Sequence, residues 1–476
     1  MAQLEQLQPE RVFAYFEELC QIPHGSGNCG AISNYLADFA QKRHLAYVQE
    51  PCGNVIIYKD GTSTSAKPVI LQAHMDMVCV KTPGNSMDMA LEGLRIGVDG
   101  DQIFARGTSL GGDDGIGVAM ILAILESDDL PHPPLEAVFT VEEEVGMDGA
   151  RALEGKLLQG RTMLNLDSET EGILTVGCAG GSVGLCTLPV TREAYDGTLL
   201  RLSLCGGTGG HSGEEIHRER ANAVVLLGRV LDSISQATAM RLCTVQGGTK
   251  HNAIPVEAEA IVSVENSKAA REAVTRMEEI LKAEFSPTDP QLHFELQTVE
   301  GAPVPLTQDA TERVIILLTI LPNGVQGYSR ALAGQVSLSL NLGVLSTEAC
   351  CVKLELLLRF AMASEKHMLK RKLTRAITVL GGTVAFSGDY PPWEYAPHSR
   401  LRPVLSGVYR EITGAVPPEI IIHAGLECGF FAEKLPGLDC VSIGPQVSDI
   451  HTTNERLSIS STQRTWKILT ETLKRL

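Results

Sequence analysis

Long hydrophobic runs, paired cysteines and a surplus of positive charge are all missing from this 476-residue sequence. The longest apolar runs, such as residues 314–321, fall well short of the ~18 residues that indicate a membrane-spanning helix. Lys and Arg number 40 against 57 Asp and Glu, and the resulting formal net charge of -17 repels phosphate backbones and anionic lipid surfaces. We therefore expect neither nucleic acid nor a membrane as a partner.

The twelve cysteines include no CxxC pair, and only Cys350 and Cys351 are adjacent. This pattern indicates neither a disulfide framework nor a thiolate zinc site, and a reducing cytoplasm is the expected location. Residues 1–19 lack the basic start and short apolar core of a secretory signal and instead fit an amphipathic helix.

The sequence has the size and composition of a globular enzyme with more than one domain, because 476 residues exceed what one hydrophobic core usually organises. Strands alternate with helices, which predicts an α/β fold with a mixed, mostly parallel sheet sandwiched by helices. We expect residues 1–180 and 391–476 to form one discontinuous catalytic domain. Residues 181–390 alternate strands with amphipathic helices in a pattern that differs from the rest of the chain. We expect them to form an inserted α+β lid domain.

Polar clusters follow the apolar segments of the first half at the points where strands are expected to end. Strands are predicted over residues 69–79, 135–141 and 162–166, and a Gly-rich turn feeds a helix after residue 111. In such sheets ligands bind beyond the carboxyl ends of the strands. The polar residues concerned are His74, Asp76, Asp113, Asp114, Glu142, Glu143, Glu144 and Asp167.

The residue types at these ends suit metal-dependent hydrolysis. His74 and Asp76 are two apart on the expected strand and so share a face, which suits an imidazole ligand held by a carboxylate, although a chance polar pair is the plainer interpretation. Of two adjacent aspartates, one can cap the helix while the other bridges a metal pair. Of successive glutamates, one can bind metal while the next accepts a proton from water, whereas a solvated charge run is the alternative.

Two further residues complete the pattern: Asp167 lies in LNLDSE and His451 in SDIHTTNE, each shortly after an expected strand. Five His, Asp and Glu residues at the ends of different strands, without thiolates, match the ligand set of zinc, cobalt or manganese hydrolases. The sequence therefore predicts metal ligands at His74, Asp113, Glu144, Asp167 and His451.

Two Gly-rich stretches superficially resemble phosphate loops, but neither residues 206–213 nor residues 111–117 contain GK[ST] or the GxGxxG spacing. Residues 107–111, GTSLG, match the GxSxG pattern of serine hydrolases. A nucleophile elbow passes from strand to helix directly at the serine, however, and here GGDDG intervenes after Ser109. Nucleotide binding and a serine nucleophile are therefore the weaker hypotheses.

With these residues in place, the whole chain resembles the M20 metallopeptidases, and within them the aminoacyl-histidine dipeptidase subgroup, also called peptidase D or Xaa-His dipeptidase. The resemblance runs nearly end to end. The motifs that carry it are IPHGSGN (22–28), LQAHMDMV (71–78), GTSLGGDDGIG (107–117), VEEEVGMDGA (141–150), LNLDSE (164–169), GGHSG (209–213), HNAIP (251–255), HAGLECG (423–429) and IGPQVSDIHTTNE (443–455).

This resemblance implies that Asp113 bridges two zinc ions, for which Co²⁺ or Mn²⁺ are possible substitutes. His74 and Asp167 would complete the coordination of one ion, and Glu144 and His451 would complete the coordination of the other. It further implies a general base at Glu143, a carboxylate at Asp76 that holds the His74 ring, and a lid residue, His211, that steadies the oxyanion. Asn252, Arg359 and Gly425 are the implied substrate-binding positions.

The implied activity is hydrolysis of dipeptides, with broad or Xaa-His preference that includes β-alanyl-histidine, by a cytoplasmic homodimer. An N-acyl amino acid deacylase or a tripeptide aminopeptidase of the same fold is the close alternative. A non-catalytic metal-binding scaffold is the alternative from another class, but it would be expected to lack Glu143 or a ligand, and all are present.

Overall fold

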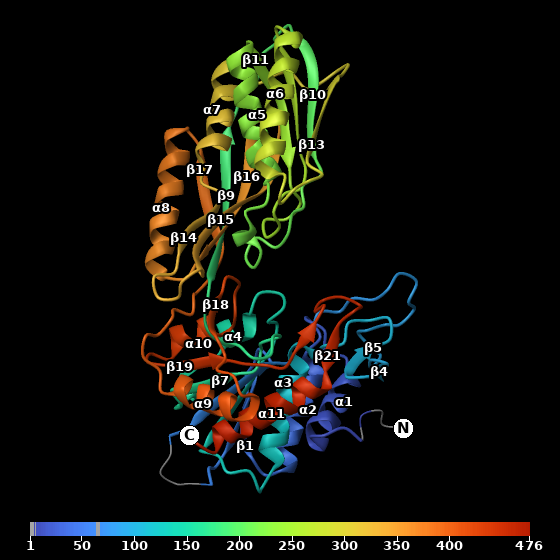
Figure 1. Ribbon diagram of the computed structural model, residues 1–476, viewed down its shortest axis with the longest axis vertical. Coiled ribbons are helices and arrows are strands. Elements are labelled where there is room, and N and C mark those ends of the chain that lie inside the picture. The colour runs from blue at the N-terminus through green and yellow to red at the C-terminus, as the bar shows by residue number, and fades with distance from the viewer. Residues whose placement is uncertain (1–3, 5, 63–66) are drawn as a thin grey trace. The chain divides into compact units, whose positions relative to one another are not determined.

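The computed structural model describes residues 4, 6–62 and 67–476, which form two compact units. The first unit contains the described residues up to Gly177 together with Tyr395–Ile421 and Leu426–Leu476. The second contains Cys178–Glu394 and Ile422–Gly425. The first unit is therefore built from both halves of the sequence, and each unit has its own sheet (Figure 1).

The first unit contains an 8-stranded sheet in the order β1-β2-β6-β3-β7-β19-β8-β18. The four central strands, β6, β3, β7 and β19, pair in parallel, whereas β1, β2 and β8 join by antiparallel pairing. The α/β class is thus confirmed, with the parallel part confined to the centre of the sheet. The strands are β1 Ala46–Gln49, β2 Val55–Lys59, β3 Val69–His74, β6 Leu135–Thr140, β7 Thr162–Asn165, β8 Leu174–Cys178, β18 Glu419–Ile422 and β19 Asp439–Ser442.

Helices cover both faces of this sheet, because every residue of β3 and β6 is buried although successive side chains point to opposite faces. The apolar helix α3 packs against β3 and α1 packs on α3, while α9 packs against β19 and α11 packs on α9. The helices are α1 Glu10–Cys20, α2 Gly30–Lys42, α3 Gly112–Glu126, α4 Asp148–Ala152, α9 Leu401–Thr413, α10 Cys428–Lys434 and α11 Ile459–Leu473, with a 3-10 turn η1 at Gly155–Leu157.

A smaller sheet lies beside the ligand-bearing loops of the same unit, in the order β20-β21-β5-β4. Strand β21 pairs antiparallel with β5 and so joins the C-terminal part of the chain to the segment that precedes α3. Its strands are β4 Ile96–Asp99, β5 Gln102–Ala105, β20 Val447–Ser448 and β21 Arg456–Ser458.

The second unit contains a 9-stranded antiparallel sheet in the order β13-β10-β12-β11-β15-β16-β9-β17, with β14 paired to β15. Burial alternates along β10 and β17, as in a sheet with one face open to solvent. The strands are β9 Gly180–Pro189, β10 Thr198–Cys205, β11 Met240–Gly247, β12 Ala258–Val264, β13 His293–Thr298, β14 Gly324–Tyr328, β15 Val336–Thr347, β16 Cys351–Phe360 and β17 Thr383–Tyr390.

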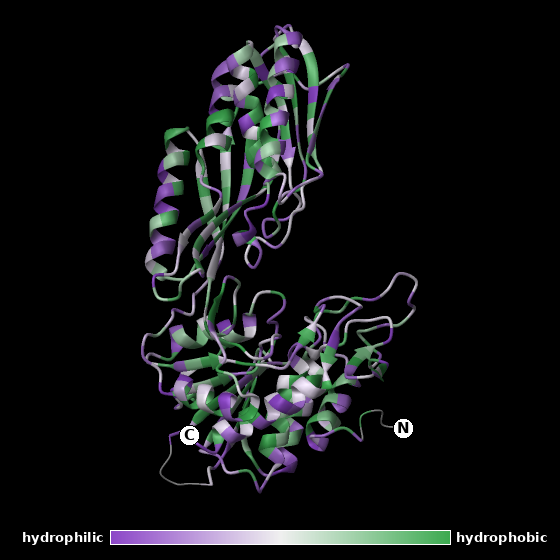
Figure 2. Ribbon diagram, viewed as in Figure 1, coloured by the Kyte–Doolittle hydropathy of each residue, from purple (hydrophilic) through white to green (hydrophobic). Residues whose placement is uncertain are grey.

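Four helices of the second unit pack on its sheet and enclose a core of Leu, Val, Ile and Ala residues. Hydrophobic residues follow the strands in Figure 2, and polar residues follow the outer side of α8. The elements are α5 Ala223–Ala237, α6 Ser267–Phe285, α7 Gln308–Ile320 and α8 Ala363–Val379, with a 3-10 turn η2 at Ile216–Arg218.

Three sequence-based expectations concern the strands, the cysteines and the helices. Strand β3 ends at His74 rather than continuing to residue 79, so Asp76 lies beyond the strand. The prediction that His74 and Asp76 share a strand face was therefore wrong. None of the twelve cysteines, all in the described part of the chain, forms a disulfide. Among the described residues, no helix combines the length and the apolar character that a bilayer crossing requires.

Candidate metal centre

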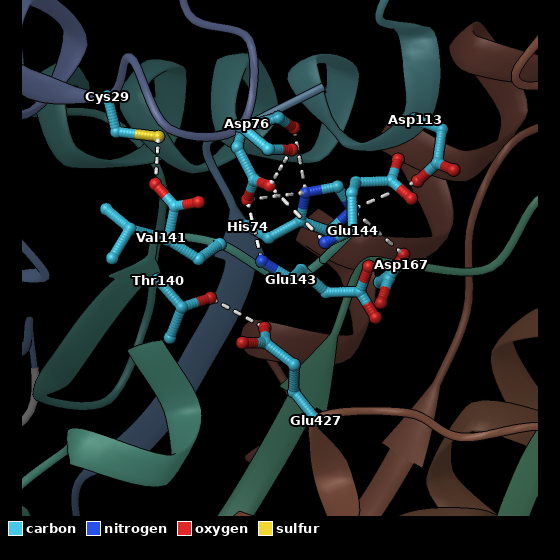
Figure 3. Close-up of polar contacts among 12 residues, drawn as sticks. Cys29, His74, Asp76, Asp113, Thr140, Val141, Glu143, Glu144, Asp167 and Glu427 are labelled. Atoms are coloured by element: carbon cyan, nitrogen blue, oxygen red, sulfur yellow. Dashed lines mark hydrogen bonds and ion pairs between the residues drawn. The ribbon is translucent and has the colours of Figure 1, made fainter. Parts of the chain in front are cut away.

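His74 lies close to two aspartates of the candidate centre. It is the last residue of β3 and is almost fully buried. Its Nε2 lies 3.1 Å from Oδ1 of Asp113 and 3.5 Å from Oδ1 of Asp167, which follows β7. The neighbouring parallel strands β3 and β7 thus bring both side chains to the same edge of the sheet (Figure 3).

Asp113 presents its two carboxylate oxygens to two different histidines. Its backbone (φ -88°, ψ 109°) is not helical, although α3 formally begins at Gly112. While Oδ1 faces His74, Oδ2 lies 3.3 Å from Nε2 of His451, and that same nitrogen lies 2.9 Å from Oε1 of Glu144. A carboxylate shared in this way can bridge two cations.

The Asp76 carboxylate organises the loop after β6. It accepts hydrogen bonds from the backbone N–H of Glu143 (2.9 Å) and of Glu144 (3.3 Å), and from the Ser26 hydroxyl (2.8 Å). Nδ1 of His74 lies 3.0 Å from the backbone carbonyl of Asp76 and 3.6 Å from its carboxylate. Asp76 therefore orients the His74 ring mainly through its carbonyl, and its carboxylate positions the two glutamates.

The three successive glutamates project in different directions, as expected for residues past a strand end. Glu144 faces His451, whereas the Glu142 carboxylate accepts the Gly27 N–H at 2.9 and 2.8 Å. Burial, together with the nearby carboxylates of Asp167, Glu427 and Glu144, raises the pKa of Glu143 well above its usual range. Glu143 thus combines a raised proton affinity with a position beside the ligands.

These residues fit a metal pair. The buried Oδ2 atoms of Asp167 and Asp114 have no hydrogen-bond partner among the described residues, and His74 with Asp113 and Glu144, or with Asp114 and Asp167, offers ligand atoms within 4.8 Å of one another. Carboxylates and imidazoles without thiolates suit zinc, cobalt or manganese. One of the two adjacent aspartates was expected to cap the helix, yet Asp114 as well as Asp113 belongs to these groups, and Gly117 leaves the space that the Asp114 carboxylate occupies.

Protonated histidines supply the positive charge in the metal-free arrangement. Burial lowers the pKa of His74, but Asp167, Asp113 and Asp76 outweigh it and raise that pKa well above its usual value. Hydrogen bonds with Asp113 and Glu144 raise the pKa of His451 to about 10, and burial raises the pKa of Asp167 to about 6. Metal ions would replace these protons, because a ligating imidazole is neutral.

The serine-nucleophile hypothesis does not agree with the geometry. The Ser109 hydroxyl is buried, donates to the Val78 carbonyl at 2.6 Å and accepts the Val80 N–H at 3.2 Å. Ser109 therefore fixes the loop that precedes the ligand-bearing turn.

A second polar cluster lies inside the second unit, around the buried Arg359 of β16. Its Nη1 donates to the Tyr390 hydroxyl at 3.1 Å, its Nη2 lies 3.2 Å from Nε2 of His211, and its buried Nε has no hydrogen-bond partner among the described residues. No carboxylate in the described part of the chain forms an ion pair with it. Gly213 is required here, because a Cβ would lie 2.9 Å from Nε of Arg359.

The cluster contains two histidines, His211 and His423, and both are neutral. Burial first, and then the adjacent Arg359, lower the pKa of His211 and bring the pKa of His423 to about 3. Nε2 of His423 hydrogen-bonds with the Ser339 hydroxyl at 2.7 Å. Asn252 is exposed and lines a cavity of about 830 Å³ together with His211, and Gly425 lies between β18 and α10.

Comparison with known proteins assigns the family. The model of peptidase family M20/M25/M40 matches residues 70–475. The chain belongs to this family. It is 36% identical over 482 residues to the cytosol non-specific dipeptidase of Escherichia coli strain K12, covering 100% of this chain and 99% of the relative.

Solved structures agree with this assignment. The M20 chain matches the crystal structure of the aminoacylhistidine dipeptidase from Vibrio alginolyticus with a TM-score of 0.93 and 35% identity, over 100% of this chain and 98% of the other. An aminopeptidase from Bacillus cereus, with a TM-score of 0.58 and 16% identity over 98% of both chains, shares the fold.

Two buried acids of the M20 centre were missed from the sequence. The Glu455 carboxylate accepts three successive backbone N–H groups, from Leu110 (2.7 Å), Gly111 (3.2 Å) and Gly112 (2.8 Å), immediately before Asp113. It lies four residues after His451 and so fixes the turn that carries Asp113 to the loop that carries His451. A lone glutamate at the end of the HTTNE motif was the available signal.

Glu427 is the other missed acid, and it lies below the ligands at the start of α10. Its Oε2 accepts from Nε2 of Gln72 at 2.6 Å. The same oxygen accepts from the Thr140 hydroxyl at 2.6 Å, a contact drawn in Figure 3. Burial raises its pKa to about 8. A single acid inside the otherwise apolar and Gly-rich segment AGLECGFF was the signal that could have found it. A further acid, Glu169, groups with Asp113 and Asp167.

Proposed function

We propose that the protein is a metal-dependent dipeptidase that uses two zinc ions. The observation that carries this proposal is the convergence of two histidines and two further carboxylates around Asp113, with a separate buried carboxyl at Glu143. Metal binding requires only the ligands, whereas peptide hydrolysis also requires a group that transfers protons. The family membership and the full-length similarity to enzymes named dipeptidases support the same activity.

The proposed ligand sets follow the distances in the first unit. Asp113 would bridge the two ions, His74 and Asp167 would hold one ion, and Glu144 and His451 would hold the other. Zinc is preferred on the ligand types, and Co²⁺ or Mn²⁺ would fit the same donors.

We assign proton transfer to Glu143. When bound, the metal ions lower the pKa of water and polarise the peptide carbonyl. The Glu143 carboxylate would accept the proton of the attacking water and deliver it to the leaving amine. Asp76 fixes the backbone of Glu143 through the 2.9 Å hydrogen bond and thereby holds the base in place.

The second unit is proposed to act as a lid that binds the substrate, and the first unit as the catalytic domain. Arg359 is buried without an ion-pair partner among the described residues, which suits bidentate binding of a C-terminal carboxylate. His211 would stabilise the oxyanion, and Asn252 and Gly425 would contact the peptide. Burial and Arg359 lower the pKa of His211, so the neutral ring adds no charge to the Arg359 cluster.

The proposed substrates are dipeptides, with broad or Xaa-His preference that includes β-alanyl-histidine. We propose both the broad and the Xaa-His preference because one relative is named a non-specific dipeptidase and the other an aminoacylhistidine dipeptidase. A cytosolic homodimer is also proposed. The name of the first relative supports the location, and light scattering of the purified protein tests the oligomeric state.

The test is to measure metal content and hydrolysis of a dipeptide panel, including His-containing members, before and after chelation. We expect two metals per chain and cleavage that chelation abolishes and metal restores. The Glu143→Gln variant should keep both metals and lose turnover by about 10²–10⁴-fold, the range of general acid–base catalysis. Glu142→Gln, a change at the neighbouring glutamate that faces Gly27, is the matched control. Cleavage of acylated amino acids or tripeptides but not of dipeptides would contradict the proposal.

A further inference from the structure

The ring of His211 in the second unit faces two hydrogen-bond donors. The backbone N–H of Glu214 donates to Nδ1 at 3.2 Å, and Nη2 of Arg359 lies 3.2 Å from Nε2. Burial and Arg359 lower the pKa of His211, so the ring is neutral. A neutral imidazole carries one N–H and accepts a hydrogen bond only at its other nitrogen. The two donors therefore compete, and one ring nitrogen must direct its N–H at a donor.

The fold holds both donors against the ring. Glu215 accepts the backbone N–H of His211 at 3.0 Å and forms an ion pair with Arg220 at 3.1 Å, and these contacts fix the turn that directs the Glu214 N–H at Nδ1. Arg359 is buried on β16, so its guanidinium cannot turn out to solvent. The competition is therefore built into the second unit.

The guanidinium is the stronger of the two donors, because a hydrogen bond from a charged group is stronger than one from a backbone amide. In the observed arrangement Nε2 of His211 therefore accepts from Arg359, and the ring proton lies on Nδ1. An Nε2 atom in this state has no proton to donate to an oxyanion.

A carboxylate bound to Arg359 changes this balance. A guanidinium holds a carboxylate bidentately through Nε with Nη2 or through Nη1 with Nη2, and both pairs include the nitrogen that faces His211. The charged carboxylate is a stronger acceptor than a neutral imidazole. Nη2 is then drawn to the carboxylate, and Nδ1 of His211 becomes free to accept the Glu214 N–H.

We propose that binding of the substrate's terminal carboxylate at Arg359 switches His211 from the Nδ1–H to the Nε2–H tautomer and so prepares it to donate to the oxyanion. One proton leaves Nδ1 to water and another enters at Nε2 from water, so the ring stays neutral. The inference rests on the proposed dipeptidase function. It makes recognition of the free C-terminus a condition for fast turnover as well as for binding.

The first test reads the tautomer of His211 by ¹⁵N NMR of zinc-loaded protein labelled at histidine, with His211→Gln identifying the signals. We expect wild-type protein to show the Nδ1–H tautomer and saturating glycine to shift it to Nε2–H. Glycinamide, which lacks the carboxylate, should leave Nδ1–H in place. Arg359→Met should show Nε2–H without glycine, and Arg371→Met, at an exposed arginine of α8, should behave as wild-type protein does.

A kinetic test separates the switch from binding alone. It compares the dipeptide Ala-Ala with its C-terminal amide. In wild-type protein we expect kcat to be about 10²-fold higher for the free peptide, the size of effect that one oxyanion donor has. In His211→Ala this difference in kcat should largely disappear, because no donor remains to be switched.

The outcomes separate the switch from the dipeptidase proposal. An Nε2–H tautomer in wild-type protein without glycine, or an Nδ1–H tautomer that glycine does not change, would overturn the switch. A kcat difference that persists in His211→Ala would overturn it as well. If wild-type protein cleaves no dipeptide, the dipeptidase proposal fails, and the NMR result alone then judges the switch.

Discussion

The histidines of the two polar clusters have opposite electrostatic surroundings. In the first unit His74 and His451 face carboxylates, and the pKa of each is raised. In the second unit His211 and His423 lie close to Arg359, and burial and that cation lower the pKa of each. The same side chain is therefore protonated in one cluster and neutral in the other.

This difference indicates which ligand each cluster is built to receive. A cluster with excess buried carboxylate needs cations, whereas a buried guanidinium without a carboxylate partner among the described residues needs an anion. A peptide hydrolase with metal ions in one place and a binding site for a terminal carboxylate in another requires both kinds of cluster.

Asp113→Asn should break the first cluster with the largest effect. The bridging charge between His74 and His451 is lost, so we expect metal content to fall far below two ions per chain and hydrolysis to fall to the level of the chelated protein. Elemental analysis and a dipeptide assay measure both. Asp38→Asn, on the exposed face of α2, should change neither. Two retained ions would contradict the bridging assignment.

Arg359→Met tests the second cluster. Hydrogen bonds to charged groups contribute ~1.5–3 kcal/mol each, so we expect kcat/KM for peptides with a free C-terminus to fall by about 10²-fold or more. Metal content should not change. Peptides with an amidated C-terminus, which we expect wild-type protein to cleave poorly, should be affected little. An equal loss on both peptides would show that Arg359 does not recognise the carboxylate.

Glu455→Gln is expected to lower the affinity for metal without unfolding the protein. Loss of the carboxylate weakens the three hydrogen bonds that hold the turn before Asp113, and such outer contacts are typically worth about 10–100-fold in metal affinity. Glu136→Gln is a close control, because Glu136 is also buried and accepts the backbone N–H groups of Gln159 and Gly160. Calorimetric metal titration should separate the two variants, and equal affinities would refute the role of Glu455.

Glu427→Gln should have the smallest effect, on the pH dependence of stability in the metal-free protein. Burial raises the pKa of Glu427 from 4.5 to about 8, so the folded state binds this proton more tightly than the unfolded state. The free energy of unfolding should therefore fall as the pH rises from 4.5 to 8, by at most ~1.4 kcal/mol per pH unit from this group. Thermal unfolding at several pH values should show a flatter dependence in the variant. An unchanged slope would mean that Glu427 ionises normally.

Much of the candidate centre follows from the sequence because the chain places each ligand just beyond a strand or in a Gly-rich turn. His74 and Asp167 lie close together for the reason predicted, since β3 and β7 are parallel neighbours. The side chain directions after a strand were less predictable. Strand β3 ends two residues before Asp76, and the Asp76 carboxylate consequently serves the glutamate loop.

Contacts that join distant parts of the chain could not be read from local pattern. Glu455 meets Gly112 across 343 residues, and Glu427 meets Gln72 across 355. No periodicity or spacing encodes such partners, so the local sequence could at most single out the two acids and could not show which groups they contact. The charge of the Arg359 cluster is equally hidden, because its neighbours come from separate strands and loops.

The position of β19 has a consequence for the order of synthesis. Residues 439–442 form a strand between β7 and β8, although β7 is complete at residue 165. A nascent chain therefore has a gap in its central sheet until residues 439–442 have been translated. The candidate ligand His451 is translated later still, so the full candidate ligand set exists only after the last strand of the central sheet has been made.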